Sequence, residues 1–238
     1  GFDNLRVYAV VGGNYGEIWG TTFTRVTEGQ YKGKLLLNSS GLPQGNSEAT
    51  KIGDQQADCL LGWTNTFSYK NFTLSFLVDA RIGGEIFSGS NRLLQANGVA
   101  ACTVANGERK PFVVDGVIAN EDGSYSPSTI EVDPQAYWSA ITGSTGNLGI
   151  GEANIYDATN VRLRNLSLNY AFPKAMLKNT PFQQVKLGVS CNNVWMIYSD
   201  MNGVDPESVF ATSTNATGFE NAASPTSRSF LFNVTLGF

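Results

Sequence analysis

Apolar and polar residues alternate strictly in the middle of the chain, and this pattern predicts a long β-hairpin. From Cys59 to Tyr69 the apolar positions fall on every second residue, and after Lys70 and Asn71 the alternation resumes from Phe72 to Ile82. A period of two places all of these apolar side chains on one face of a strand. Each predicted strand has about eleven residues, against about five or six in ordinary soluble strands.

Three further alternating segments follow, and two long polar stretches separate the strands. We expect strands at 161–172, with a β-bulge near Arg164 and Asn165 where the phase shifts, at 185–192 and at 230–238. Residues 173–183 predict a compact turn that holds one helical turn near 175–177. Residues 84–160 and 199–227 read as long loops, and 12–27 as one or two irregular strands. The prediction is therefore an all-β chain of about six or seven strands.

Strands of this kind fit either a soluble β-sandwich or a transmembrane β-barrel. In a sandwich the apolar face is the core, whereas in a barrel it faces lipid and the polar face lines a wet lumen. A length of about 9 to 11 residues matches a tilted strand that crosses a bilayer, so it favours the barrel. Asp79 and Arg81 lie mid-strand on the polar face and are the predicted lumen-facing charges.

Composition removes several classes of function. The chain has no histidine and only three cysteines, Cys59, Cys102 and Cys191, so we expect no catalytic residues, no metal site and no cofactor. Charged residues make up 15% of the 238 residues, the net charge is −4, and the basic residues are scattered, which argues against a nucleic-acid partner. Asp200, Asp205 and Glu207 do not have the spacing of a calcium loop, so we expect them in a solvated loop.

The last strand ends on Phe238, which we interpret as a C-terminal signal for insertion into the bacterial outer membrane. If this end lies in the periplasm, the turns at 70–71 and 173–183 also lie there, and both long loops lie outside. Short periplasmic turns and long outer loops are typical of such barrels.

Aromatic residues supply the remaining candidates. Tyr137 and Trp138 fall in the longest predicted loop, where their rings can stack on a sugar or a peptide, or else pack the loop. Aromatic rings near strand ends on the apolar face are expected at the membrane interface. These residues are Trp63, Tyr69, Phe72, Tyr170 and Phe172.

Several collinear stretches resemble one family, the SusC/RagA type of TonB-linked outer-membrane transporters of Bacteroidetes. The stretches are GNYGEIWG at 13–20, TFSYKNFTL at 66–74, GGEIF at 83–87, VRLRNLSLNY at 161–170, NNVW at 192–195, GVDPE at 203–207 and the tail from Pro225 to Phe238. Their order spans nearly the whole chain.

The resemblance implies that residues 1–238 are the C-terminal portion of a barrel of roughly 22 strands. It also implies a plug domain and an export signal, both absent from this chain, a SusD-like surface lipoprotein and TonB as partners, and import of glycans or peptides. The alternative left open is a soluble or surface β-sandwich that binds carbohydrate or acts as an adhesin. An enzyme is not expected, because no general base is evident.

Overall fold

The computed structural model describes residues 4–104, 107–143, 148–201, 203–209 and 216–238, and most of its regular structure is β-strand. The chain divides into two compact units. Unit 1 comprises residues 1–56, 84–157 and 208–223, and unit 2 comprises residues 57–83, 158–207 and 224–238.

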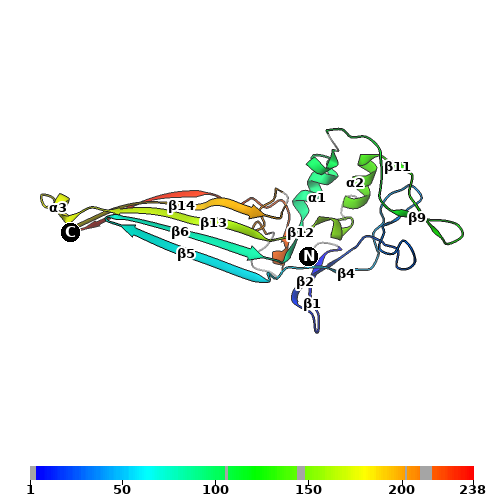
Figure 1. The fold of residues 1–238 in the computed structure, drawn as a ribbon, viewed down its shortest axis with the longest axis horizontal. Helices are drawn as coiled ribbons and strands as arrows, with labels where there is room; N and C mark the ends of the chain where they lie inside the picture. The colour runs from blue at the N-terminus through cyan, green and yellow to red at the C-terminus, as the bar shows by residue number, and fades with distance from the viewer. Residues whose placement is uncertain (1–3, 105–106, 144–147, 202, 210–215) are drawn as a thin grey trace. The chain divides into compact units, whose positions relative to one another are not determined.

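Unit 2 is built on one antiparallel sheet of five long strands, which run side by side in Figure 1. The strand order is β16-β14-β13-β6-β5, so that β16 and β5 lie at the edges. The strands are β5 (Cys59–Tyr69), β6 (Phe72–Ile82), β13 (Asn160–Ala171), β14 (Gln184–Ser199) and β16 (Ser229–Gly237). The predicted hairpin and the three later strands are thereby confirmed, although β14 extends seven residues beyond the predicted end at 192.

The irregularities of this sheet lie where the sequence pattern changes phase. The pairing of β13 with both neighbours shifts between Leu163 and Asn165, which confirms the predicted bulge. The β5–β6 turn places Lys70 at a φ of 53°, a left-handed conformation that a tight hairpin turn requires. The short helix α3 (Lys174–Leu177) confirms the predicted helical turn after Pro173.

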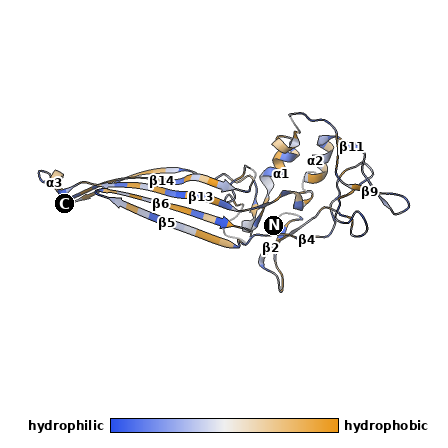
Figure 2. Cartoon of the chain, viewed as in Figure 1, coloured by the Kyte–Doolittle hydropathy of each residue, from blue (hydrophilic) through white to orange (hydrophobic). Residues whose placement is uncertain are grey.

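Burial differs sharply between the units. Both clusters of buried hydrophobic side chains belong to unit 1. In the described part of unit 2 only Ala158 and Met201 are buried hydrophobic residues, and neither lies in one of the five strands. The large apolar side chains of the sheet are exposed or half-buried, so in the described part of unit 2 the sheet is a single layer. Figure 2 shows the alternation along these strands.

Unit 1 corrects the prediction that residues 84–160 form one irregular loop. It contains many short strands and two helices, α1 (Gly89–Ala96) and α2 (Pro134–Thr142), which contact each other. Its small sheets have the orders β1-β2-β4, β10-β9-β3, β11-β8 and β12-β7-β15. The strands are β1 (Arg6–Ala9), β2 (Tyr15–Gly20), β3 (Leu36–Leu37), β4 (Thr50–Asp54), β7 (Glu85–Ser88), β8 (Phe112–Val113), β9 (Val117–Ala119), β10 (Tyr125–Pro127), β11 (Glu131–Val132), β12 (Ile155–Asp157) and β15 (Phe219–Glu220).

Long-range pairing explains how unit 1 folds from segments without a local period. β3 pairs in parallel with β9, and β7 pairs in parallel with β15, across gaps of about 80 and about 130 residues respectively. One core joins Leu5, Ile18, Phe87 and Phe219. Within the described residues, no helix is long and apolar enough to cross a bilayer.

Candidate functional site

The five-stranded sheet has one apolar face and one polar face. On the apolar face, residues of β6 lie opposite apolar residues of both neighbours: Val78, for example, pairs with Trp63 of β5 and Leu163 of β13. These side chains are open rather than packed; Trp63 is 59% exposed and Phe232 of β16 is 82% exposed. A continuous apolar face without a covering layer needs a non-aqueous neighbour.

Most of the predicted interface aromatics gather at one end of the sheet. Phe72 and Tyr170 lie on paired positions with ring centroids 4.7 Å apart, and Phe172 lies 5.0 Å from Tyr170. Tyr69 pairs with Phe72 across the hairpin. Trp63 differs from the expectation, because it lies near the middle of β5, where its ring lies 5.3 Å from the ring of Phe76 and nearly perpendicular to it.

Hydrogen bonds between side chains follow the polar face. Thr66 and Ser75 hydroxyls are 2.9 Å apart across β5 and β6. The Asn165 amide donates to Asn192 Oδ1 at 2.7 Å, and the Asn192 amide donates to Ser229 Oγ at 3.2 Å, which links β13, β14 and β16. Hydroxyl and amide groups that are partly satisfied in this way remain able to contact water.

Five ionised side chains form a network at the end of this polar face, and we call it the charge cluster: Asp79, Arg162, Arg164, Asp205 and Glu207. Arg162 forms an ion pair with Asp205 in which the two side chains are only 5% and 9% exposed. Arg164 donates to Asp79 Oδ2 at 2.8 Å and to Glu207 Oε2 at 2.7 Å. Each arginine of β13 therefore fastens an acid from the segment at 205–207 onto the sheet.

The acids of this segment are not the solvated loop residues that the sequence analysis expected. Burial by itself raises the pKa of Asp205, but hydrogen bonds from Arg162, Thr226 and two backbone N–H groups outweigh it and bring the pKa to about 2. The hydrogen bond from Arg164 lowers the pKa of Glu207. The expectation failed because the two arginines that bind these acids lie some 40 residues earlier in the chain.

Asp79 and Arg81 lie on the polar face, as predicted, but their partners differ. Asp79 belongs to the charge cluster, where it binds Arg164. Arg81 pairs in register with Asn160, and its Nε donates to the carbonyl of Gly83 at 3.5 Å. Sequence reasoning missed Arg162 and Arg164 as charge-bearing residues of the polar face. The local signals were the polar position of Arg162 between Val161 and Leu163 and the bulge at Arg164.

Tyr137 and Trp138 lie in helix α2 rather than in an irregular loop, and they have different surroundings. Asp133 caps this helix by accepting from the N–H of Gln135 at 2.8 Å, and Pro134 occupies the first turn. Tyr137 packs against the cluster of Leu37, Val114 and Val132 and lies 5.1 Å from the ring of Phe112. Tyr137 thus contributes to the core.

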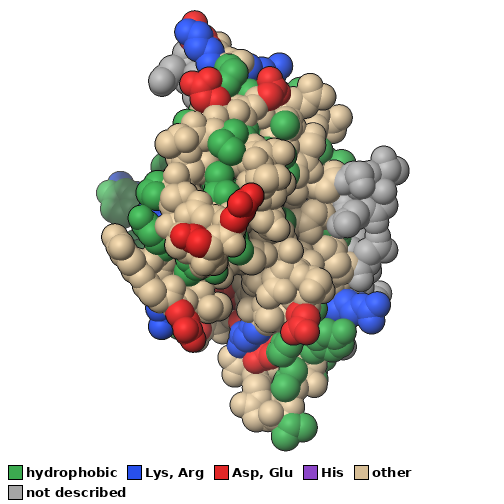
Figure 3. All heavy atoms as spheres, turned by 90° about the vertical axis from the view of Figure 1, so that its right-hand side faces the viewer, with side chains coloured by type: hydrophobic (Ala, Val, Ile, Leu, Met, Phe, Trp, Pro, Cys, Tyr) green, Lys and Arg blue, Asp and Glu red, His purple; other side chains and the backbone are tan. Residues whose placement is uncertain are grey.

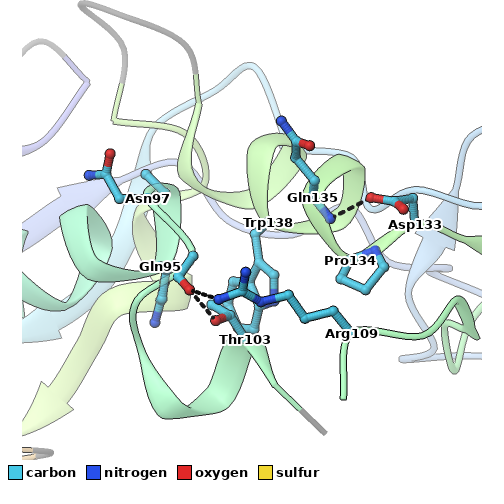
Figure 4. A pocket seen from close by; sticks show the side chains of 10 residues that line it. Gln95, Asn97, Thr103, Arg109, Asp133, Pro134, Gln135 and Trp138 are labelled. Carbon is cyan, nitrogen blue, oxygen red and sulfur yellow. Dashed lines mark hydrogen bonds between the residues drawn. The ribbon is translucent and has the colours of Figure 1, made fainter. Parts of the chain in front are cut away.

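Trp138 lines a pocket of about 420 Å³ between the end of α1 and the start of α2, which we call the α1–α2 pocket (Figure 4). Polar side chains make up much of the rest of its lining. They include Gln95, Asn97, Thr103, Arg109, Asp133 and Gln135. Its volume falls within the roughly 300–1,000 Å³ of typical small-ligand pockets.

Among the described residues, no group of three His, Cys, Asp or Glu side chains is arranged to hold a metal ion. Cys59, Cys102 and Cys191 are free thiols, and burial raises the pKa of the Cys102 thiol. A raised pKa lowers the fraction of reactive thiolate.

Two of three comparisons with known proteins give matches, to TonB-dependent receptors in sequence and to the RagAB transporter in structure. No protein-family model matches the chain. Similar proteins include TonB-dependent receptor P3 of Formosa agariphila, 28% identical over 247 aligned positions that cover all of this chain and 22% of that protein. TonB-dependent receptor P39 of the same organism is 28% identical over 165 positions, 68% of this chain and 14% of that protein.

Solved structures of similar fold include the RagAB peptide transporter, with a TM-score of 0.55, 13% identity and coverage of 99% of this chain and 24% of that chain. The RagAB peptide importer in its open-open state gives a TM-score of 0.53 at 12% identity, again with 99% of this chain covered. The chain spans less than a quarter of these relatives. The similar sequences confirm the resemblance to TonB-dependent receptors, and the solved structures show that the chain shares the fold of part of the RagAB transporter.

Proposed function

We propose that this chain, which resembles TonB-dependent receptors along its whole length, is the C-terminal part of a nutrient importer in the bacterial outer membrane. In this proposal the five-stranded sheet is a segment of the wall of a roughly 22-stranded barrel, and unit 1 contributes the outer loops and the short strands associated with them. The transported nutrients are glycans or peptides. The partners are TonB, bound through a part that precedes this chain, and a SusD-like surface lipoprotein.

One observation carries the proposal: the apolar face of the sheet is continuous and uncovered, while the opposite face carries hydroxyls, amides and the charge cluster. A soluble sandwich would bury these apolar side chains under a second layer, and the described residues form no such layer over the sheet. Lipid on one side and a water-filled lumen on the other satisfy both faces at once.

The lengths of the connections support the orientation that we propose. The β5–β6 turn has two residues, whereas residues 83–159 and 200–228 connect strands at the opposite end of the sheet. We place the short turns and Phe238 in the periplasm and the long connections outside. In this orientation the charge cluster lies at the outer end of the lumen face, with Asp79 and Arg81 directed into the lumen.

The test uses two neighbouring residues of β6 in the full-length transporter. Val78→Lys places an ammonium group on the apolar face near the centre of the strand, and Leu77→Lys places the same group on the polar face. A lysine facing lipid near the midplane costs about 2–4 kcal/mol, whereas a lumen lysine costs little. We therefore expect a large loss of folded protein in the outer membrane for Val78→Lys alone.

The first readout is the amount of folded protein of each variant in the isolated outer membrane. The second is whether detergent is needed to extract the parent protein and keep it monodisperse. Parent protein that is monodisperse in buffer without detergent would refute the proposal in favour of a soluble module. Equal losses for the two variants would also refute it.

A further inference from the structure

We propose that the α1–α2 pocket binds a neutral saccharide, with Trp138 as the stacking wall and Arg109 as a hydrogen-bond donor to sugar hydroxyls. The inference deepens the proposed function and rests on it, because it assigns the pocket to recognition of the imported nutrient. It separates Trp138, a ligand-contacting residue, from Tyr137, a core residue.

The position of Trp138 is fixed by its neighbours in α2, and its ring lies 5.2 Å from the ring of Tyr137. Tyr137 anchors α2 in the cluster of Leu37, Val114 and Val132, and the fully buried Thr142 donates its hydroxyl to the carbonyl of Trp138 at 2.7 Å. In Figure 4 the Trp138 side chain extends from α2 toward Thr103 and Arg109. An aromatic ring held in this way offers a preformed apolar surface and loses little conformational entropy on binding.

Arg109 is available for a ligand. One of its terminal nitrogens donates to the carbonyl of Gly98, which also accepts from the hydroxyl of Thr103 at 3.0 Å. Among the described residues, no carboxylate forms an ion pair with Arg109. A guanidinium has five N–H donors, so several remain for hydroxyl or ring oxygens.

The rest of the lining selects among ligand classes. Asp133 keeps a carboxylate oxygen that can accept from a hydroxyl, and the side-chain amides of Asn97 and Gln135 provide both donors and acceptors. A sugar hydroxyl both donates and accepts, and so matches this mixture. The pocket does not suit an apolar ligand, because Trp138 is the only large apolar side chain among the described residues that line it.

Two other ligand classes fit less well. A carboxylate or sulfate would be attracted by Arg109 but repelled by Asp133, and Figure 3 shows a face on which acidic and basic side chains are interspersed. A common way to bind an extended peptide is to add it as a strand to a sheet edge. The pocket is lined by helix ends and loop residues, and none of its lining residues belongs to a strand.

The test measures binding of the full-length transporter in detergent to an array of neutral oligosaccharides built from pentoses, hexoses and N-acetylhexosamines. Acidic oligosaccharides and peptides are printed on the same array. We expect a neutral glycan to be bound, Trp138→Ala to weaken its binding about tenfold or more, and Trp138→Phe to retain it within about threefold. Tyr125→Ala is the matched control, because it removes an exposed aromatic side chain of unit 1 outside the pocket.

Arg109→Met gives a second variant for the case that Trp138→Ala does not fold, because Arg109 is exposed. We expect it to weaken glycan binding at least fivefold. The inference is overturned if no neutral glycan binds, if binding is unchanged in Arg109→Met and in folded Trp138→Ala, or if only acidic glycans or peptides bind. The same preparation is scored for folded transporter that needs detergent for extraction from the outer membrane. A folded membrane barrel that binds no glycan therefore refutes the pocket and leaves the proposed function standing.

Discussion

Replacing Arg162 by methionine tests whether the charge cluster holds the segment at 205–207 on the sheet. Arg162 and Asp205 are both almost fully buried, and removal of one partner from a buried ion pair costs about 3–5 kcal/mol. Asp205 keeps three donors: the N–H of Glu207 at 3.0 Å, and the N–H and hydroxyl of Thr226 at 2.9 and 2.6 Å. Because these donors still compensate the buried carboxylate, we expect a loss below that range, about 2–3 kcal/mol.

Hydrogen–deuterium exchange of the full-length protein in detergent measures this loss locally. The amides of Glu207 and Thr226 both donate to Asp205, so a loss of about 2–3 kcal/mol should accelerate their exchange about 30- to 150-fold. The control is Lys34→Met, which breaks an exposed ion pair with Asp115 and should leave exchange at these two amides unchanged. If the two variants change exchange at Glu207 and Thr226 by the same factor, the cluster is not an anchor and the reasoning is wrong.

Three further predictions concern single groups. The folded pKa of Asp205 is about 2 and its ordinary pKa is about 3.9, so the stability that its carboxylate gives the folded state is complete above about pH 4 and is lost as the pH falls toward 2. Protease protection of the segment at 205–207 should therefore decline over that window in the parent protein, and equal protection down to pH 2 would contradict this. Phe238→Ser should reduce the folded protein recovered from the outer membrane, whereas Phe182→Ser, which changes its ring neighbour at 5.1 Å, should not; equal recovery of the two would exclude a terminal signal. Asp133→Ala should destabilise α2 by about 0.5–2 kcal/mol, seen as faster amide exchange in 135–138, while Asp133→Asn keeps the cap; identical exchange in the two variants would exclude capping.

The strands of the proposed barrel wall could be predicted from the sequence, because the alternation that specifies each strand lies within that strand. A period of two over eleven residues fixes the faces of β5 and β6, and a phase shift marks the bulge before Asn165. Unit 1 could not be found in this way. Its strands have as few as two residues and pair with segments far away in the chain, as Leu36–Leu37 does with β9. No window of sequence carries such a signal.

The candidate site residues also divide into those with a local sequence signal and those whose partners are distant in the chain. Asp79 was found because it occupies a polar position of the alternation within one strand. The role of Asp205 was missed because its partner, Arg162, is distant in sequence and buried only in the folded sheet. Trp138 and Tyr137 are adjacent, and only the packing of α2 separates the core side chain from the pocket side chain.

Spin labels placed one at a time along β6, from Phe72 to Ile82, give the most direct measurement of the central claim. In the full-length protein in lipid vesicles, accessibility to oxygen, which concentrates in hydrocarbon, should peak at 74, 76, 78 and 80. Accessibility to a water-soluble nickel reagent should peak at the alternate positions, including 75, 77 and 79. A profile in which 74, 76, 78 and 80 are shielded from both reagents would mean that protein covers this face, and it would contradict the account.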